Sequence, residues 1–563
     1  MPRRSHSVIA MLRARIFAPA PLGLALTLAL SAFSPALNHA AQPNTNMIEL
    51  AHVDSYTQYN DCWGYRDPNT GVEYAILGTT TGTSILNITD PFNPYETGFI
   101  PGVQSIWRDV ETYGDNLYVG TEGSGGGIQV IDLSNPEAPV LVRTKGTFSS
   151  HTIRIDEDAG ILYCHGVTGG TPASGFRAFD LTASPDDPTV LANRATPYYH
   201  DGFTKNGRFY GASITGPGRV DVLRVTDMPA YSVMAIINYP QQYPGTHNVW
   251  TSEDGNWLYT TDEFLGAGTV RVWDVADTSS ILQLNSFPVW PNTTVHNVYV
   301  KNDTAWCAWY EEGVLAFDVT DPLNEVQIAS FDTGPDTMAI GPYAGCWAVY
   351  PFLPSGVIVS SDILQGLHLT YYSEQIGTVS GTVTNAMTGD PIPNAEVRVP
   401  GFFNRTILTD ALGNYSVVLP GGSQQFIASA TNYESDTSAV VVVDETIVDY
   451  DIALISQATG VGGSRESESA PPAAMRISAS PNPAHGATTF ALDLPRSEQV
   501  LLVVYDASGR RVRALTNGVL GAGRHSVAWD GRDDGGRAVG SGTFLTRLIA
   551  GVEARSTKVV LAR

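Results

Sequence analysis

The feature that most constrains the fold is an internal repeat with a period of 47–49 residues. Each copy contains short stretches of alternating apolar and polar residues, separated by turn residues. A period in the forties that holds about four short strands is typical of one blade of a β-propeller. Four copies open on a histidine, at intervals of 49, 47 and 49 residues: His151, His200, His247 and His296.

One strand phrase of the repeat occurs seven times, at residues 83–91, 127–136, 175–182, 219–227, 269–277, 313–322 and 366–370. The seventh repeat ends at Tyr372 without a fourth strand, whereas Met47–Gln58 resembles the fourth strands and precedes the first repeat. We expect Met47–Gln58 to complete the seventh blade, because ring closure removes two exposed sheet edges. An open solenoid of the same repeats would leave those edges bare.

The fifth repeat illustrates how each unit divides into strands. Its turn, Glu253-Asp-Gly-Asn256, separates two apolar stretches, and further turn residues follow. The pattern predicts four strands, at residues 247–252, 257–261, 269–275 and 281–287.

The first forty residues have the pattern of a secretory signal peptide. Four arginines (Arg3, Arg4, Arg13 and Arg15) precede the short apolar run 21–30, and small residues near Ala41 offer a cleavage site. We expect residues 1–41 to be removed on export. An uncleaved anchor is the competing interpretation, but the apolar run is short for a membrane span. We expect no other transmembrane span.

The acidic composition limits the classes of partner. The formal net charge is -24, and loss of the four arginines would make it about -28. Such a charge repels phosphate backbones, so nucleic-acid binding is not expected. It is compatible with solubility outside the cell and with cation binding.

The histidines are the first candidates for a functional site. They lie at the start of the innermost strand of four successive blades, where we expect them to form an arc at the channel mouth. Corners between the second and third strands should bring carboxylates to the same rim. Converging imidazoles and carboxylates are the ligands that transition metals such as Zn prefer. The candidate ligand-binding residues at this mouth are Arg108, Asp109, Glu122, His165, Asp201, Asp262, Glu263, Glu311, Glu312 and Asp362.

Other interpretations of this ring stay open. The same groups could act as general acids and bases or as the polar part of a small-molecule pocket. A repeated polar residue also often only fixes each blade, by a hydrogen bond to the backbone of a neighbouring blade. That structural interpretation applies especially to the residues beside the ring positions: Asp61, Asp109, Asp201, Asn248 and Asn297.

Neither the cysteines nor any catalytic motif of the sequence identifies a reaction. The chain has no HExxH, GxSxG, P-loop or CxxC motif. Cys62 and Cys346 lie near the inner starts of the first and seventh blades, where a disulfide would reinforce ring closure and two free thiols are the alternative. Cys164 and Cys307 lie three blades apart and should not reach each other.

The tail resembles two families of β-sandwich. Residues 377–454, with Thr388-Gly-Asp-Pro-Ile-Pro-Asn-Ala395, resemble the carboxypeptidase regulatory-like domain. Residues 455–475 are rich in Gly, Ser, Pro and Glu, which predicts a flexible linker. Residues 476–563, with Ser480-Pro-Asn-Pro483 and Gly540-Ser-Gly-Thr-Phe544, resemble the Ig-like domain of flagellar hook-capping proteins and the sorting domain of type IX secretion. That resemblance implies export or anchoring machinery as a partner.

Residues 47–372 resemble the LVIVD-repeat, choice-of-anchor B family of exported bacterial proteins. The phrases that carry the resemblance include Asp61-Cys-Trp-Gly-Tyr-Arg-Asp-Pro68, Tyr118-Val-Gly-Thr-Glu-Gly123 and Val349-Tyr-Pro-Phe-Leu-Pro-Ser-Gly356. The resemblance implies a propeller at the cell surface and no particular reaction.

The sequence as a whole predicts an all-β chain, with a seven-bladed propeller over residues 47–372 followed by two small β-sandwich domains. Its leading functional interpretation is an exported, non-catalytic protein, outside the cell or on its outer surface, whose propeller face binds a protein, a glycan or a small molecule. The alternative is a metal-dependent enzyme that uses the histidine arc. A third interpretation makes the propeller a purely structural component of a surface layer.

Overall fold

The computed structural model describes residues 44–169, 175–215, 218–239, 245–263, 268–287, 293–334, 343–457, 475–484, 486–506, 510–551 and 553–562. Within these ranges every regular element is a β-strand. The prediction of an all-β chain is therefore confirmed. The predicted signal peptide and most of the predicted linker lie outside the described residues. None of the described elements is a helix that could span a membrane.

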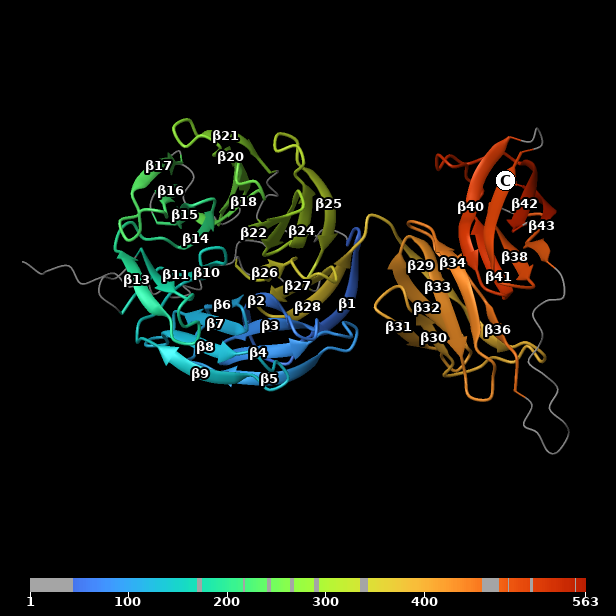
Figure 1. Cartoon of the computed structure of the whole chain (residues 1–563), viewed down its shortest axis with the longest axis horizontal. Coiled ribbons are helices and arrows are strands. Elements are labelled where there is room, and N and C mark those ends of the chain that lie inside the picture. The colour runs from blue at the N-terminus through green and yellow to red at the C-terminus, as the bar shows by residue number, and fades with distance from the viewer. Residues whose placement is uncertain are drawn as a thin grey trace, which may run out of the picture. The chain divides into compact units, whose positions relative to one another are not determined.

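The first half of the chain folds as a propeller whose antiparallel sheets surround a common centre (Figure 1). In the described part of residues 47–372, the strands form seven four-stranded sheets. Four of these sheets contain β2 (Tyr59–Arg66), β3 (Glu73–Thr79), β4 (Gly82–Asn87) and β5 (Tyr95–Pro101); β6 (Arg108–Tyr113), β7 (Asn116–Thr121), β8 (Ile128–Asp132) and β9 (Val140–Lys145); β10 (Ile153–Asp156), β11 (Ile161–His165), β12 (Phe176–Asp180) and β13 (Thr189–Arg194); and β14 (Asp201–Lys205), β15 (Arg208–Ser213), β16 (Arg219–Arg224) and β17 (Val233–Asn238).

The remaining three sheets follow the same order, in which the first strand of each repeat is innermost. The strands of the fifth repeat lie within one residue of the predicted bounds. These sheets contain β18 (Thr246–Thr251), β19 (Trp257–Asp262), β20 (Val270–Asp274) and β21 (Leu282–Ser286); β22 (Val295–Lys301), β23 (Thr304–Trp309), β24 (Gly313–Asp318) and β25 (Val326–Phe331); and β26 (Cys346–Tyr350), β27 (Val357–Asp362) and β28 (Gly366–Tyr372) with β1 (Met47–Val53).

The ring closes through the N-terminal strand. β1 pairs antiparallel with β28, with Met47 opposite Tyr372 and Val53 opposite Leu367, and is thereby the outermost strand of the seventh sheet. The inner strand β2 contacts both β6 and β26, so the innermost strands also form a continuous ring. The first and last segments of the propeller thus complete one blade together.

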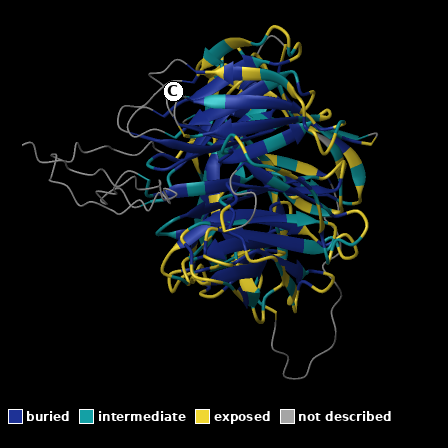
Figure 2. Ribbon diagram, turned by 90° about the vertical axis from the view of Figure 1, so that its left-hand side faces the viewer, coloured by how far each residue is buried: buried dark blue, intermediate teal, exposed yellow. Residues whose placement is uncertain are grey.

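The core of the propeller lies in the middle strands. In β23 and β24, for example, every residue is buried except Thr304 at the start of β23 and Asp318 at the end of β24. Interior positions are buried because adjacent blades cover both faces of each sheet. The outermost strands are more exposed, and β9 has no buried residue. Figure 2 shows the same contrast, with buried residues along the strands and exposed ones mainly at turns.

Polar side chains tie successive inner strands together. Asp61 accepts a hydrogen bond from the backbone N–H of Val110 (3.1 Å), and Asp109 accepts one from Ile153 (2.6 Å). The same contact recurs where Asn248 accepts from the N–H of Val298 at 3.0 Å. A buried carboxylate or amide therefore satisfies a backbone donor of the next blade. These three side chains therefore make the inter-blade contacts that the structural interpretation predicts.

The tail contains two further β-domains, each formed by two sheets. Their core residues alternate along the strands, as expected where one face of a sheet is buried. The first domain contains β29 (Ile376–Asn385), β32 (Asn414–Pro420), β35 (Ile447–Asp449) and β36 (Ile452–Leu454) in one sheet, and β30 (Glu396–Val399), β31 (Arg405–Leu408), β33 (Gly422–Ser429) and β34 (Asp436–Val442) in the other. The second contains β37 (Arg476–Ser480), β38 (Thr488–Leu494) and β41 (Gly523–Trp529), and β39 (Glu498–Tyr505), β40 (Arg511–Leu520), β42 (Gly542–Ala550) and β43 (Glu553–Leu561).

Candidate metal centre

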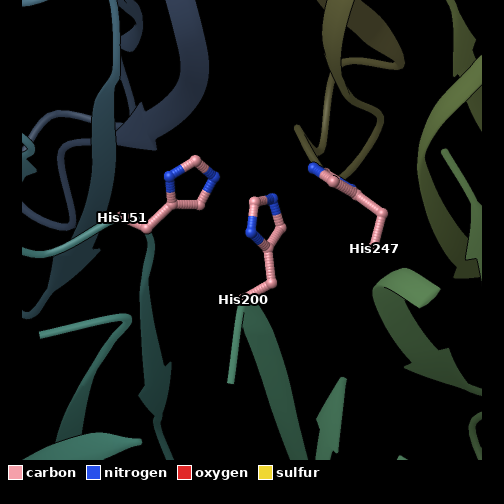
Figure 3. A group of neighbouring side chains, drawn as sticks. All are labelled: His151, His200 and His247. Carbon is pink, nitrogen blue, oxygen red and sulfur yellow. The ribbon is translucent and has the colours of Figure 1, made fainter. Parts of the chain in front are cut away.

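The four repeated histidines lie side by side at the starts of consecutive inner strands. The ring centroids of His151 and His200 are 3.7 Å apart. Those of His200 and His247 are 4.6 Å apart, and those of His247 and His296 are 4.2 Å apart. Figure 3 shows that the first three rings point toward one another rather than outward between the blades. One step along the repeat thus places each imidazole against the next.

Three of these imidazoles approach metal-binding distance. One ring nitrogen from each of His151, His200 and His247 lies within 4.8 Å of the other two. Two nitrogens bound to one Zn²⁺ at about 2.0–2.1 Å can lie no more than about 4 Å apart. A small contraction of the cluster would therefore bring all three nitrogens onto one ion.

Two carboxylates extend the cluster. Glu122 contacts His151, with Oε1 2.6 Å from Nδ1. Glu263 lies 3.8 Å from His247, measured from Oε2 to Nε2, and Tyr310 donates a hydrogen bond to its other oxygen at 2.8 Å. His247, Glu263 and His296 form a second group of potential ligands within 4.8 Å of one another. His247 belongs to both groups.

Burial keeps three of the four imidazoles neutral. Desolvation, together with the nearby His151, lowers the pKa of His247 to about 3. Desolvation also holds the pKa values of His200 and His296 well below the usual range, with the adjacent histidines adding to the effect. Because a metal binds the deprotonated imidazole, these residues are in the binding form at neutral pH. Nδ1 of His247 has no hydrogen-bond partner among the described residues.

A small cavity lies beneath the arc. Its volume is about 20 Å³, which is room for about one water molecule. An organic ligand of ordinary size does not fit in it. The lining residues are Trp107, Arg108, Asp109, His151, Thr152, Arg154, Asp201, His247, His296, Asn297 and Trp347.

A buried cation balances the acidic residues on the inner strands. Arg154 lies 3.6 Å from Asp201 and 3.7 Å from Glu111. Its guanidinium also lies over the aromatic rings of Trp250 and Tyr299, 5.5 and 5.7 Å from their centroids. The positive charge of Arg154 therefore compensates carboxylates that would otherwise be buried without a counter-ion.

Several predicted rim residues are engaged elsewhere. Asp262 pairs with Arg271 at 2.7 Å, because both are buried and need a partner. Asp362 accepts hydrogen bonds from the N–H groups of its own corner and from Thr333, and Glu311 accepts one from the N–H of Thr294. Glu312 is fully buried. Asp362 and Glu311 thus cap loops, and Asp262 pairs with an arginine, where the sequence pattern predicts rim ligands.

Two more predicted residues lie next to the site without joining the cluster. Arg108 is buried and donates to the backbone carbonyls of Thr79 (2.9 Å) and Val103 (2.6 Å). His165 is fully buried, with Nδ1 3.0 Å from the hydroxyl of Thr152. Burial lowers its pKa to about 4. Asp109 and Asp201 line the cavity but are occupied by the inter-blade and Arg154 contacts.

Of the two alternatives left open for Cys62 and Cys346, the structure has two free thiols and not a disulfide. Cys62 donates a weak hydrogen bond to the carbonyl of Val359 (3.6 Å), and Cys346 donates one to Ala348 (3.8 Å). Each thiol thus already has its own acceptor. Ring closure depends on strand pairing instead. Cys164 and Cys307 are also free, as their separation predicts.

Aromatic residues at the mouth were not predicted. Trp107 and Trp347 line the cavity, and the carbonyl of Trp347 accepts a hydrogen bond from Nδ1 of His296 at 2.5 Å. Both tryptophans adjoin ring positions of the repeat, next to Arg108 and Cys346. Their position in the repeat, beside the ring residues, is the sequence feature from which their place at the mouth could have been predicted. Tyr310, which orients Glu263, follows strand β23 and had no such signal.

Comparisons with known proteins identify the two tail domains. Residues 378–455 match the carboxypeptidase regulatory-like domain, and residues 478–550 match the FlgD Ig-like domain. These matches agree with the predicted domains of the tail. No curated protein matches the chain.

Similar solved structures are β-propellers at low identity. The β-propeller domain of Cps50 (Swd1) from Myceliophteria thermophila is 9% identical with a TM-score of 0.41, and the match covers 57% of this chain and 99% of that one. The RRP9 WD40 repeats are 9% identical with a TM-score of 0.40, and the match covers 59% of this chain and 99% of that one. Similarity at this level carries no argument about function. The chain therefore contains a carboxypeptidase regulatory-like domain and an FlgD Ig-like domain behind a β-propeller.

Proposed function

We propose that this chain is an exported binding protein whose propeller mouth holds one divalent transition-metal ion. His151, His200 and His247 would bind the ion directly. Three protein ligands leave a coordination position open, as in metal sites that accept an exogenous ligand. That open position would be where the propeller face contacts a donor group of a surface ligand, whether a protein, a glycan or a small molecule.

One observation carries the proposal, namely the convergence of the His151, His200 and His247 imidazoles, two of which line a cavity of about 20 Å³. A cavity of that volume suits an ion or a water molecule. Burial lowers the pKa of His247 to about 3, which favours the neutral form that a metal requires. Among the described residues, Nδ1 of His247 has no hydrogen-bond partner although its ring is buried against other imidazoles, and packing alone does not explain this.

The purely structural interpretation is weaker for the histidines than for their neighbours. Asp61, Asp109 and Asn248 already hold adjacent inner strands through backbone N–H groups. The imidazoles of His200 and His247 contact other imidazoles. His247 also has a backbone hydrogen bond with His296 of the next blade. That one bond does not account for the contacts between the rings.

The proposed location rests on the sequence. The signal-like residues 1–41, the acidic charge of -24 and the resemblance to the LVIVD-repeat, choice-of-anchor B family all favour export to the cell surface. The FlgD Ig-like match at residues 478–550 is compatible with a C-terminal anchoring or sorting domain of the type IX kind. We propose that this domain contacts the export or anchoring machinery.

Metal content of the purified mature chain tests the proposal. After incubation with Zn²⁺ and removal of the excess, elemental analysis should find one ion fewer per chain in a His200→Ala, His247→Ala double variant than in the wild type. A half-buried histidine in the tail, His525, provides the matched control, and His525→Ala should leave the content unchanged. A His200→Gln, His247→Gln variant keeps the side chains polar if the alanine variant fails to fold. Equal metal content in wild type and both double variants would overturn the proposal.

A metal-dependent hydrolytic enzyme is the second candidate. Burial raises the pKa of Glu263 to about 7, against the lowering effect of the Tyr310 hydrogen bond. A carboxylate with such a pKa beside a metal-bound water is suited to general-base catalysis. Metal-dependent turnover of ester, phosphate or glycoside reporters that is lost in Glu263→Gln would favour this candidate. Turnover that Glu263→Gln leaves intact would exclude the role of Glu263 in it.

A further inference from the structure

A second cluster of potential ligands lies away from the mouth, on the strand pair that closes the ring. His52 of β1 stands directly opposite His368 of β28. Their imidazoles stack with centroids 4.3 Å apart and an interplanar angle of 5°. Directly opposed residues of an antiparallel pair are the closest side-chain neighbours across the two strands. The closing strand thus contributes one imidazole and its partner strand contributes the other.

A β-bulge adds a carboxylate to the same side. Successive side chains of a regular strand alternate between faces, so Glu49 and His52, three residues apart, would point in opposite directions. The register of β1 shifts between Glu49 and Ala51, which inserts one extra residue. The shift restores Glu49 and His52 to one face of the sheet. Both side chains are exposed there, whereas the Leu50 side chain between them is buried.

The distances within the cluster suit a metal ion. Oε1 of Glu49 lies 3.2 Å from Nδ1 of His368. Two ligand atoms bound at the tetrahedral angle, about 2.0–2.2 Å from one Zn²⁺, lie about 3.4 Å apart. One atom from each of Glu49, His52 and His368 lies within 4.8 Å of the other two. The three groups therefore form a compact set of two imidazoles and one carboxylate.

Hydrogen bonds and packing prepare the two rings. Nε2 of His52 lies 2.5 Å from the carbonyl of Gln365, so this nitrogen carries the proton and Nδ1 keeps its lone pair. His368 is only 5% exposed and packs against Phe331, with ring centroids 5.5 Å apart. In the part of the chain that the structure describes, Nε2 of His368 has no hydrogen-bond partner. Nδ1 of His368, which lies beside Glu49, is the nitrogen placed to bind an ion, so the unpartnered Nε2 is not part of the site.

We propose that Glu49, His52 and His368 bind a divalent transition-metal ion, such as Zn²⁺, that links β1 to β28. β1 is an outermost strand and pairs within its sheet only with β28. An ion held by both strands would cross-link the one blade that is assembled from the two ends of the propeller. A ligand that binds the closed ring and not the open one stabilises the closed ring. This site shares no residue with the mouth, so neither site depends on the other.

The test uses the full mature chain in which the mouth has been disabled by His200→Ala and His247→Ala. Calorimetric titration with Zn²⁺ should find one remaining ion per chain, and bound Zn²⁺ should raise the melting temperature. His52→Ala or Glu49→Gln, added to that background, should weaken Zn²⁺ binding by at least about tenfold and abolish the rise. Both positions are exposed, so these variants should fold, and His525→Ala is the matched control.

Three results would overturn the proposal. The first is a mouth-disabled chain that binds no Zn²⁺ at the ring closure. The second is a His52→Ala variant that binds Zn²⁺ with unchanged affinity. If His52→Ala lowers the melting temperature equally with EDTA and with Zn²⁺, the stacked rings only pack together, and the metal site is likewise rejected. The proposal for the mouth is tested separately, because it fails if replacing only His200 and His247 leaves the metal content of the chain unchanged.

Discussion

The imidazoles of His200 and His247 lie 4.6 Å apart between ring centroids, although 47 residues separate them in the chain. Their contact follows from the repeat, because one period along the chain equals one step around the ring of inner strands. Four consecutive copies with histidine at the same position therefore build a continuous arc. The remaining inner strands have other residues at this position, which makes the arc one-sided.

Replacement of Asn248 should destabilise the propeller. Its amide accepts from the N–H of Val298 and donates to Asp201 at 2.7 Å, and all three groups are buried. Asn248→Ala leaves a buried donor and a carboxylate without these partners, so we expect a loss of about 2–4 kcal/mol in the free energy of unfolding. Chemical denaturation measures it. Asn256→Ala, at an exposed turn of the same blade, should cost less than about 0.5 kcal/mol, and equal effects of the two variants would contradict the inter-blade role.

Arg154 should be more important for stability than an exposed arginine. Arg154→Met removes the positive charge beside Glu111 and Asp201, and we expect it to cost about 3–5 kcal/mol. The loss should shrink as the pH falls, because the uncompensated carboxylates of the folded variant would take up protons more readily than those of the unfolded chain. Denaturation curves at several pH values test both statements. Arg66→Met, at an exposed strand end, is the control, and a similar cost for it would contradict the account.

The stability of the metal-free protein should fall below pH 6.5, in part because of His165. Burial lowers the pKa of His165 to about 4 in the folded protein, while the unfolded chain binds a proton near pH 6.5. Between these values the unfolded state holds more protons, so unfolding becomes easier as the pH drops. The contribution of His165 is about 3 kcal/mol. His165→Gln measured in EDTA should flatten the profile between pH 6.5 and 4, whereas His525→Gln should not, and an unchanged slope in His165→Gln would show that its ring is not neutral.

All four cysteines should be present as unreactive thiols. Burial raises the pKa values of Cys62 and Cys346 well above the usual range, which suppresses the reactive thiolate. A thiol reagent should therefore modify none of them in the folded protein and all four after denaturation without reductant. Two missing thiols after denaturation would restore the disulfide that the structure excludes.

The repeat made the architecture of the propeller predictable. Hydrophobic alternation with turns at a fixed period located the strands of the fifth repeat to within one residue, and the unmatched segment at Met47 predicted the closing strand. The position of the four histidines followed from the same register. These are properties that depend on backbone pairing, and the sequence pattern carries them directly.

Side-chain partners at the rim were less predictable. Asp262 and Glu263 are adjacent in the sequence, but Asp262 pairs with Arg271 while Glu263 approaches His247. Successive side chains of a strand point to opposite faces, so only one of these two adjacent carboxylates faces the mouth. The cluster on β1 was not foreseen either, because the bulge between Glu49 and Ala51 breaks the alternation that strand patterns assume.

Anomalous diffraction from crystals of the mature protein loaded with Zn²⁺ tests the central claim most directly. The account predicts an anomalous peak at the zinc edge between His151, His200 and His247, about 2.0–2.2 Å from one nitrogen of each ring. The ion should be lost from crystals of the His200→Ala, His247→Ala variant. Imidazoles that keep their close contact with no anomalous peak between them, in crystals soaked with saturating Zn²⁺, would contradict the claim that the mouth is a metal site.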